Sequence, residues 1–158
     1  MTNWTQKTQE ILTEKTENYT SQEKANVNFE YLKNLLAKIE GNDIPDSEEL
    51  RTKIEQVING IQHKTTNQKI QYKTKNLNDI TNLQTFVKEN FNYIPKGKFK
   101  KSYTSQGIAL GISIGVAVGV AIGKIAIGLP IGMLFGIAIG QSVGNNLDRK
   151  AEIENRVL

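Results

Sequence analysis

Residues 107–144 read GIALGISIGVAVGVAIGKIAIGLPIGMLFGIAIGQSVG, and this stretch decides the fold. Glycine recurs at every fourth residue in two runs, with one gap of five residues between them. The runs are Gly107, Gly111, Gly115, Gly119, Gly123 and then Gly128, Gly132, Gly136, Gly140, Gly144. Lys124 is the only charged residue between Lys101 and Asp148. Apolar length combined with this spacing of small residues predicts a helical hairpin in a membrane, with helices that pack closely against other helices.

The first run contains a second row of small residues, which lies two residues after each glycine. Its members are Ala109, Ser113, Ala117 and Ala121. Two residues turn a helix by about 200°, so the two rows lie on nearly opposite faces. A two-helix hairpin uses only one of these faces, and we expect the other to meet another copy of the protein. The second run has bulky residues such as Leu134 in the equivalent row, so we expect its helix to face lipid on its back.

The five-residue gap between Gly123 and Gly128 predicts the turn of the hairpin, near residues 124–129. Pro130 then suits the first position of the second helix, where its missing N–H costs nothing. This arrangement puts Lys124 at the far headgroup level, with its aliphatic stem in the apolar region.

Two other structures are compatible with the same stretch. Small residues alternate with branched ones, which also suits a pore strand or a cross-β segment. However, 17 residues of strand reach about 56 Å, much longer than a membrane strand needs. A hairpin buried in a soluble assembly until it is triggered is the third interpretation, and so small a chain has little polar mass to cover one. We therefore favour the membrane hairpin.

The positive charge of the chain is concentrated beside the apolar stretch. The net charge is +4, and the segment KGKFKK at residues 96–101 carries four lysines. Such a collar predicts contact with anionic lipid headgroups. Interleaved Lys and Phe also occur in nucleic-acid-binding segments, but the adjacent apolar stretch explains the collar with fewer assumptions. The expected membrane-interface residues are Lys96, Lys98, Lys100, Lys101, Lys124, Phe99 and Tyr103.

Residues 1–95 have the apolar spacing of amphipathic helices. We expect one helix over 22–40 capped by Ser21, and another that Ser47 caps, with 47–92 forming one helix or two. The predicted fold is all-α, a small N-terminal helical bundle or coiled coil followed by a C-terminal glycine-zipper transmembrane hairpin. The expected divisions are a polar helical head, a basic linker at the membrane interface, the membrane hairpin and a polar tail. Their residue ranges are 1–95, 96–104, 105–147 and 148–158.

No set of residues in the sequence predicts enzymatic chemistry. His63 is the only histidine and the chain has no cysteine, which excludes a histidine cluster and a thiolate metal site. No Gly-Lys-Ser/Thr phosphate loop follows the glycines. Asp46, Glu48 and Glu49 are explained by the start of a helix, where negative charge is favourable. We expect neither an enzyme nor a cofactor or metal site.

Residues 105–145 resemble the glycine-zipper membrane domains of bacterial proteins, through their tandem GxxxG rows. Proteins with such domains include membrane anchors, envelope proteins and pore-forming effectors passed between bacteria by contractile secretion systems. The apolar hairpin and the two small-residue faces of its first helix favour a protein that inserts into a bilayer and forms a homo-oligomer there, either permeabilising the membrane as an effector or toxin or acting as an anchor or scaffold that clusters its heads. We expect an immunity, chaperone or delivery partner for the head and, because lipid contact explains the lysine collar, no nucleic acid partner.

The N-terminal residues MTNWTQKTQEILTEK lack the apolar core of a signal peptide. We therefore expect synthesis in the cytosol without a cleavable signal. Basic residues flank both ends of the hairpin, which predicts that both termini lie on the same side of the membrane.

Overall fold

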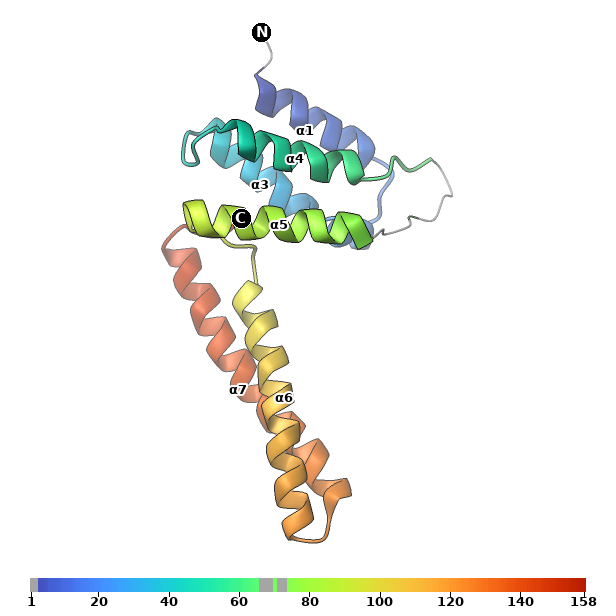
Figure 1. Ribbon diagram of the computed structural model, residues 1–158, viewed down its shortest axis with the longest axis vertical. Helices are drawn as coiled ribbons and strands as arrows, with labels where there is room; N and C mark the ends of the chain where they lie inside the picture. Colours follow the sequence, from blue (N-terminus) through green and yellow to red (C-terminus); the bar gives the residue numbers. More distant parts are fainter. Residues whose placement is uncertain (1–2, 66–69, 71–73) are drawn as a thin grey trace. The chain divides into compact units, whose positions relative to one another are not determined.

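The computed structural model describes residues 3–65, 70 and 74–158, and within these ranges all regular structure is helical (Figure 1). The chain divides into two compact units. The head comprises residues 1–94 together with Leu158, and the hairpin unit comprises residues 95–157. The helices are α1 (Trp4–Lys15), α2 (Ser21–Asn26), α3 (Phe29–Glu40), α4 (Glu48–Gly60), α5 (Thr74–Phe91), α6 (Lys98–Ala121) and α7 (Ile125–Ile153). The predicted all-α fold, with a C-terminal hairpin of two apolar helices, is confirmed.

The head is a helical bundle around an aliphatic core. The apolar stripes of α3, α4 and α5 face one another, and α1 adds Leu12. These stripes follow the three- and four-residue spacing that the sequence predicts. The aliphatic side chains of the head with no exposed surface are Leu12, Leu32, Leu35, Leu36, Ile44, Leu50, Ile54, Leu83 and Val87.

The predicted helix over 22–40 is wrong in its start and in its continuity. Its cap is Thr20, whose hydroxyl accepts from the Glu23 N–H at 3.2 Å while the Glu23 carboxylate accepts from the Thr20 N–H at 2.8 Å. The helix then breaks into α2 and α3 at Asn28, which has a positive φ of 57°. Asparagine tolerates this left-handed conformation better than most residues, so the chain can change direction there.

The predicted cap at Ser47 is confirmed, because its hydroxyl accepts from the Leu50 N–H at 3.3 Å. Residues 47–92 form two helices, since α4 ends at Gly60 and α5 begins at Thr74. A polar segment, residues 63–68, lies between the two helices, and its residues from 66 onward lie outside the described residues.

Lys15 at the end of α1 caps the C-terminus of α4. Its ammonium group donates to the carbonyl oxygens of Ile58, Asn59 and Ile61 at 3.0, 3.3 and 3.1 Å. The last carbonyls of a helix lack partners within that helix, and a lysine is a favourable donor for them. Partial burial lowers the pKa of Lys15 below its ordinary value.

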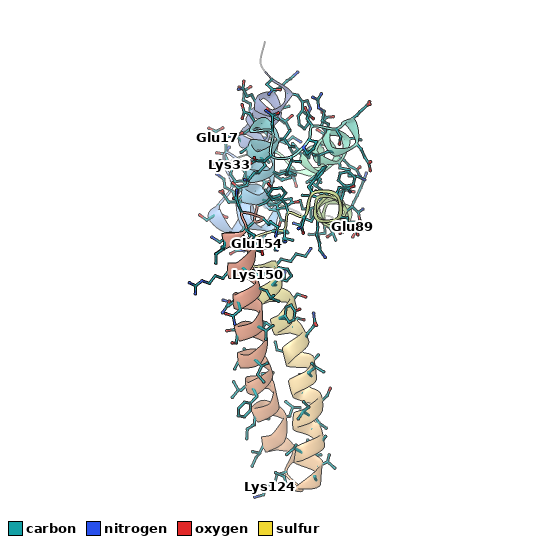
Figure 2. All side chains as sticks on the ribbon, turned by 90° about the vertical axis from the view of Figure 1, so that its left-hand side faces the viewer. Glu17, Lys33, Glu89, Lys124, Lys150 and Glu154 are labelled. Atoms are coloured by element: carbon teal, nitrogen blue, oxygen red, sulfur yellow. The ribbon has the colours of Figure 1, made fainter. Side chains whose placement is uncertain are left out.

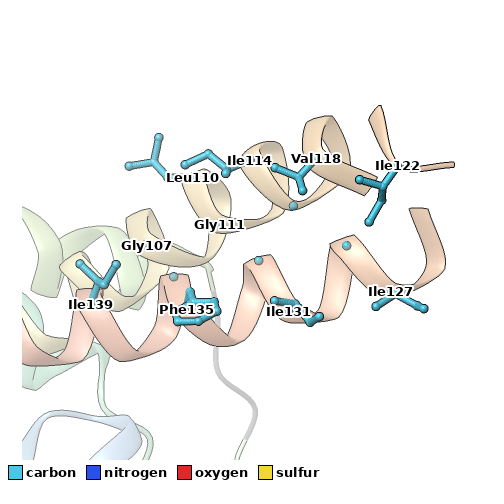
Figure 3. A pocket seen from close by; sticks show the side chains of 14 residues that line it. Gly107, Leu110, Gly111, Ile114, Val118, Ile122, Ile127, Ile131, Phe135 and Ile139 are labelled. Atoms are coloured by element: carbon cyan, nitrogen blue, oxygen red, sulfur yellow. The ribbon is translucent and has the colours of Figure 1, made fainter. Parts of the chain in front are cut away.

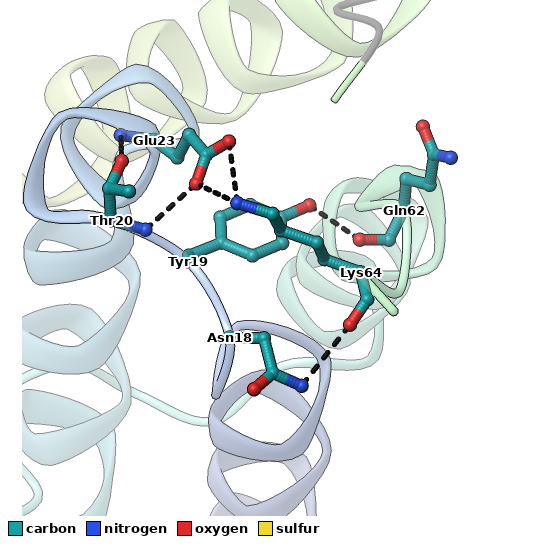
Figure 4. Close-up of polar contacts among 6 residues, drawn as sticks. All are labelled: Asn18, Tyr19, Thr20, Glu23, Gln62 and Lys64. Atoms are coloured by element: carbon teal, nitrogen blue, oxygen red, sulfur yellow. Dashed lines mark hydrogen bonds and ion pairs between the residues drawn. The ribbon is translucent and has the colours of Figure 1, made fainter. Parts of the chain in front are cut away.

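The segment that follows α4 is fastened to the link between α1 and α2 by polar side chains (Figure 4). Tyr19 donates its hydroxyl to the carbonyl of Gln62, and Asn18 donates to the carbonyl of Lys64 at 3.3 Å. Lys64 forms an ion pair with Glu23 at 2.7 Å. The hydrogen bond from Lys64 is the main reason that the pKa of Glu23 lies below its usual value. The head is therefore held together by these polar contacts and helix caps as well as by its apolar core.

Helices α6 and α7 run antiparallel and are joined by a tight turn at residues 122–124 (Figure 1). Gly123 has φ +68°, its N–H donates to Val120 O at 3.0 Å, and the Lys124 N–H donates to Gly119 O at 2.7 Å. These two bonds form a Schellman cap, which suits glycine at the left-handed position. The turn therefore begins earlier than the predicted range of 124–129 and shares only Lys124 with it, and Pro130 lies inside α7 instead of at its first position.

Two predicted boundaries also differ, because the helices are longer than the apolar stretch. Gly97 precedes α6 in a left-handed conformation with φ 70°, so most of the basic collar forms the first turn of α6 and the expected linker over 96–104 is helical from Lys98. At the other end α7 continues to Ile153, through half of the expected polar tail over 148–158.

Candidate functional site

The two glycine rows meet backbone to backbone along the hairpin. A Cβ built at Gly128 would lie 2.7 Å from Gly119 Cα, and one at Gly132 would lie 2.6 Å from Gly115 Cα. No real side chain tolerates such distances, so only glycine fits. Three glycine pairs are reciprocal: the space that each Cβ would fill is taken by the carbonyl oxygen of the other. These pairs are Gly107 with Gly136, Gly111 with Gly132, and Gly115 with Gly128.

This geometry is that of Cα–H···O contacts between helices, because each glycine directs a Cα hydrogen at the opposite carbonyl. Such contacts recur at close helix–helix interfaces and contribute about 0.5–1 kcal/mol each. They require the small-residue interface that membrane helices use for association. The glycine rows are therefore used inside one chain, to hold α6 against α7.

The glycine row of α7 continues beyond that of α6. A Cβ at Gly140 would lie 2.9 Å from Thr104 Cα, and one at Gly144 would lie 2.8 Å from Lys100 N. Non-glycine residues of α6 can occupy these positions because α7 supplies the glycine. Sequence reasoning missed this extension, although Phe99 and Tyr103 precede Gly107 at the same four-residue spacing.

Asp148 follows Gly144 at that spacing as well, and it closes the open end of the hairpin. Its carboxylate oxygens accept from the backbone N–H groups of Phe99 and Lys100 at 3.0 and 2.8 Å. Asp148 of α7 therefore caps the N-terminus of α6, where a negative charge is favourable. In the sequence, this contact is indicated by the position of Asp148 four residues after Gly144.

Gly123 is the one glycine of the two runs without a packing role. A Cβ there would meet nothing within 4 Å, and its positive φ serves the turn instead. The antiparallel register explains the difference, because Gly119 already packs against Ile125 and Gly128 on the first turn of α7. The expected packing role of Gly123 is therefore replaced by a conformational one.

The second row of small residues lies on the face of α6 away from α7. All four of its members are exposed in the structure. Ser113 donates its hydroxyl to Ala109 O in the preceding turn, at 2.9 Å, so its polar group is satisfied within α6. The row, consisting of Ala109, Ser113, Ala117 and Ala121, is called the Ala/Ser face below.

The side chains pack differently on the two sides of the glycine rows. On one side residues such as Ile112 and Ile137 are half-buried, because side chains of the two helices meet there. On the other side the side chains diverge and leave an apolar cavity of about 510 Å³ over the glycines (Figure 3). Its walls are Leu110, Ile114 and Val118 of α6, Ile122 of the turn, and Ile127, Ile131, Phe135 and Ile139 of α7. We call this cavity the open groove.

The residues that we expect at the membrane interface lie at the two ends of the hairpin. Lys124 is exposed at the turn, and Lys150 of α7 lies toward the opposite end (Figure 2). Phe99 and Tyr103 lie near that opposite end too, with ring centroids 6.5 Å apart. Of the collar lysines, Lys96 and Lys98 precede Phe99 while Lys100 and Lys101 follow it, and all but the half-buried Lys98 are exposed. A lipid-facing role for these residues stays a prediction.

Both helices of the hairpin are long and apolar enough to cross a membrane. Only 17% of the most apolar segment of either helix is buried, unlike the core helix of a soluble protein. In the described parts of the chain, no three His, Cys, Asp or Glu side chains gather as they would around a metal ion. The site offers close backbone contact and an exposed apolar surface, and it contains no reactive group.

Residues 100–146 match the model of a family described as "Glycine zipper membrane protein". The match covers under a third of the chain. No curated protein and no solved structure matches the chain. The family match confirms the resemblance that the glycine rows indicate, and together with the two apolar helices it supports a membrane protein.

Proposed function

We propose that the protein inserts into a bilayer through α6 and α7, forms a homo-oligomer there and permeabilises the membrane as an effector or toxin. One observation carries this proposal: the Ala/Ser face remains exposed after the glycine rows have joined α6 to α7. Small residues at four-residue spacing allow close approach of another membrane helix. The hairpin alone leaves that capacity unused.

The charge distribution supports an orientation for the inserted hairpin. The lysine collar precedes α6, while Arg149 and Lys150 lie in the last turns of α7. Positive residues favour the cytosolic side, so a hairpin inserted from the cytosol keeps both ends there. Lys124 then reaches the far headgroups, and the collar binds anionic lipids. We propose that the protein acts without enzymatic chemistry.

A second function, a membrane anchor that clusters the heads without making a leak, is favoured by the state of Ser113. Its hydroxyl is committed to the backbone of α6, so the Ala/Ser face presents no free polar side chain to a water-filled path. Ion pathways through membranes are usually lined by polar groups or backbone carbonyls. A leak along α6 would therefore be lined by small apolar residues, which suits an anchor better than an ion pathway.

Dye-loaded vesicles with and without anionic lipid separate the two functions. The permeabilising function predicts dye release at low protein-to-lipid ratios, with more release from the anionic vesicles. Flotation of the vesicles measures insertion independently. Stable insertion without release would favour the anchor, and absence of insertion would contradict both functions.

Two matched variants test whether the Ala/Ser face carries the function. Ala117→Leu adds bulk to that face, while Ala138→Leu adds the same bulk to an exposed position of α7. We expect the first to reduce dye release at least tenfold and to dissociate the oligomer, and the second to change neither. Equal behaviour of the two variants would contradict an oligomer built through α6.

A further inference from the structure

The open groove and the Ala/Ser face are two different surfaces of the same hairpin. We propose that the Ala/Ser face of one copy docks into the open groove of the next, so that the oligomer grows through a heterologous interface, in which two different surfaces of identical chains meet. This inference rests on the proposed homo-oligomerisation and adds which surfaces meet. It commits the groove to one occupant, a second copy of this chain.

The shapes of the two surfaces correspond. The floor of the groove is made of glycine backbone, and its walls are branched or aromatic side chains. A helix can reach such a floor only with a face that lacks bulky side chains. Among the exposed faces of the described hairpin, that of α6 has Ala or Ser at four successive positions, while the equivalent row of α7 contains Pro130 and Leu134.

The two surfaces also agree in length and depth. The Ala/Ser face extends from Ala109 to Ala121, about 18 Å along the helix, and the wall of the groove on the α6 side extends from Leu110 to Ile122 over the same length. Copies that insert in the same orientation hold the two surfaces at equal depth. Docking therefore needs no sliding of one copy along the membrane normal.

The walls of the groove are largely exposed within a single hairpin. Leu110, Phe135 and Ile139 are 65%, 67% and 63% exposed, and the other wall residues are about half exposed or more. These walls therefore offer apolar side chains to a neighbouring helix. In lipid such a contact contributes through packing, because hydrophobic burial is not gained there.

A heterologous interface determines the symmetry of the assembly. When different patches of identical chains meet, the copies form a closed ring or an open chain, and a two-fold dimer is not produced. Copies that all cross one bilayer in the same orientation are related by rotation about the membrane normal. This constraint favours a ring, with α6 and α7 of each copy contributing to its contacts.

The chain contains no cysteine, so single cysteines can report the interface in vesicles. Ser113→Cys places a thiol on the Ala/Ser face, and Ile131→Cys places one on the groove wall. Both lie within two residues of the contact between Gly111 and Gly132, hence at one depth. Within a single chain Ser113 faces away from α7, so a bond between the two thiols must join two copies.

Under mild oxidation we expect an S113C and I131C mixture to form dimers, and each variant alone to form at least tenfold fewer. A chain with both cysteines is expected to form a ladder of trimers and larger species. Ile139→Cys, about 12 Å farther along the groove, serves as the depth control and is expected not to pair with S113C.

Two results would overturn this interface. One is that S113C pairs mainly with itself, which indicates a two-fold contact. The other is that S113C pairs with A138C, on the back of α7, in preference to I131C. Mass measurement of the wild-type chain in lipid nanodiscs separates this failure from that of the proposed function. A monomer overturns both proposals, because an acyl chain then occupies the groove. An oligomer without the S113C–I131C bond overturns only the contact between the Ala/Ser face and the open groove.

Discussion

Replacing Gly132 with alanine should open the hairpin, although alanine is the better helix former. The new Cβ would lie 2.6 Å from Gly115 Cα and 2.9 Å from Gly115 N. Both atoms belong to the backbone, so no side chain can rotate away from the clash. Carbon atoms pack at about 3.5–4.0 Å, and the helices must therefore separate by about 1 Å at this level.

The separation weakens the two reciprocal pairs that Gly111 and Gly115 form with Gly132 and Gly128. These pairs comprise four Cα–H···O contacts, whose loss costs about 2–4 kcal/mol at ~0.5–1 kcal/mol each. The helix propensity of alanine offsets about 1 kcal/mol of this loss. The expected net effect is a destabilisation of the hairpin by about 1–3 kcal/mol.

The assay is reversible opening of the hairpin in mixed micelles with increasing SDS, followed by energy transfer between dyes on cysteines at Ser102 and Asn146. Ala138→Gly is the control, because it changes helix propensity at an exposed position of α7 without touching α6. A Gly132→Ala hairpin as stable as the wild type, or stabilised by the amount that alanine gains over glycine in the control, would refute backbone contact at this rung.

Three further changes test the caps and the ion pair. Asp148→Ala removes both acceptors from the N-terminus of α6 and should destabilise the closed hairpin by about 1–2 kcal/mol in the same assay, with Asp148→Asn in between. Lys15→Met leaves the C-terminal carbonyls of α4 without their charged donor, and thermal unfolding of the full chain should show the head less stable by about 1–3 kcal/mol. The ion pair with Lys64 lowers the pKa of Glu23, so the unfolded chain binds a proton more readily than the folded one. The stability that this pair contributes is complete above the ordinary pKa of 4.5 and is lost as the pH falls through the lower folded value. Denaturant titrations at pH 7 and pH 3 should therefore show a smaller acid-induced loss in Glu23→Gln than in the wild type, and an equal loss would exclude this pair as a cause.

The faces of the hairpin helices could be predicted from sequence, but the register between them could not. Four-residue spacing places each glycine row on one side of its helix, as the structure shows. Two such rows can slide past each other by one helical turn and still bring glycine against glycine. The register is determined instead by the turn, where the Schellman cap at Gly123 lets α7 begin at Ile125. Assigning all five glycines of the first run to packing therefore put the turn too late.

The head shows the same difference between spacing and local chemistry. The buried positions of α3 and α4 follow the apolar spacing, and the cap at Ser47 follows from its position before an acidic turn. The start of α2 was misassigned by one residue, because Thr20 and Glu23 form the capping-box pattern that Ser21 lacks. The break at Asn28 has no comparable signal, since it depends on the core that α3 meets.

Nine glycines within two helices are costly in water, and this cost bears on where the hairpin is stable. A glycine inside a helix is less favourable than alanine by roughly 1 kcal/mol, mostly through backbone entropy. In the hydrocarbon core an unfolded backbone would leave its N–H and C=O groups unsatisfied, so the helix persists whatever its propensity. The cost of glycine is then small, while the close contact that glycine permits is fully retained. A chain that repeats glycine along both helices of an exposed apolar hairpin thus has the composition that lipid favours and water opposes.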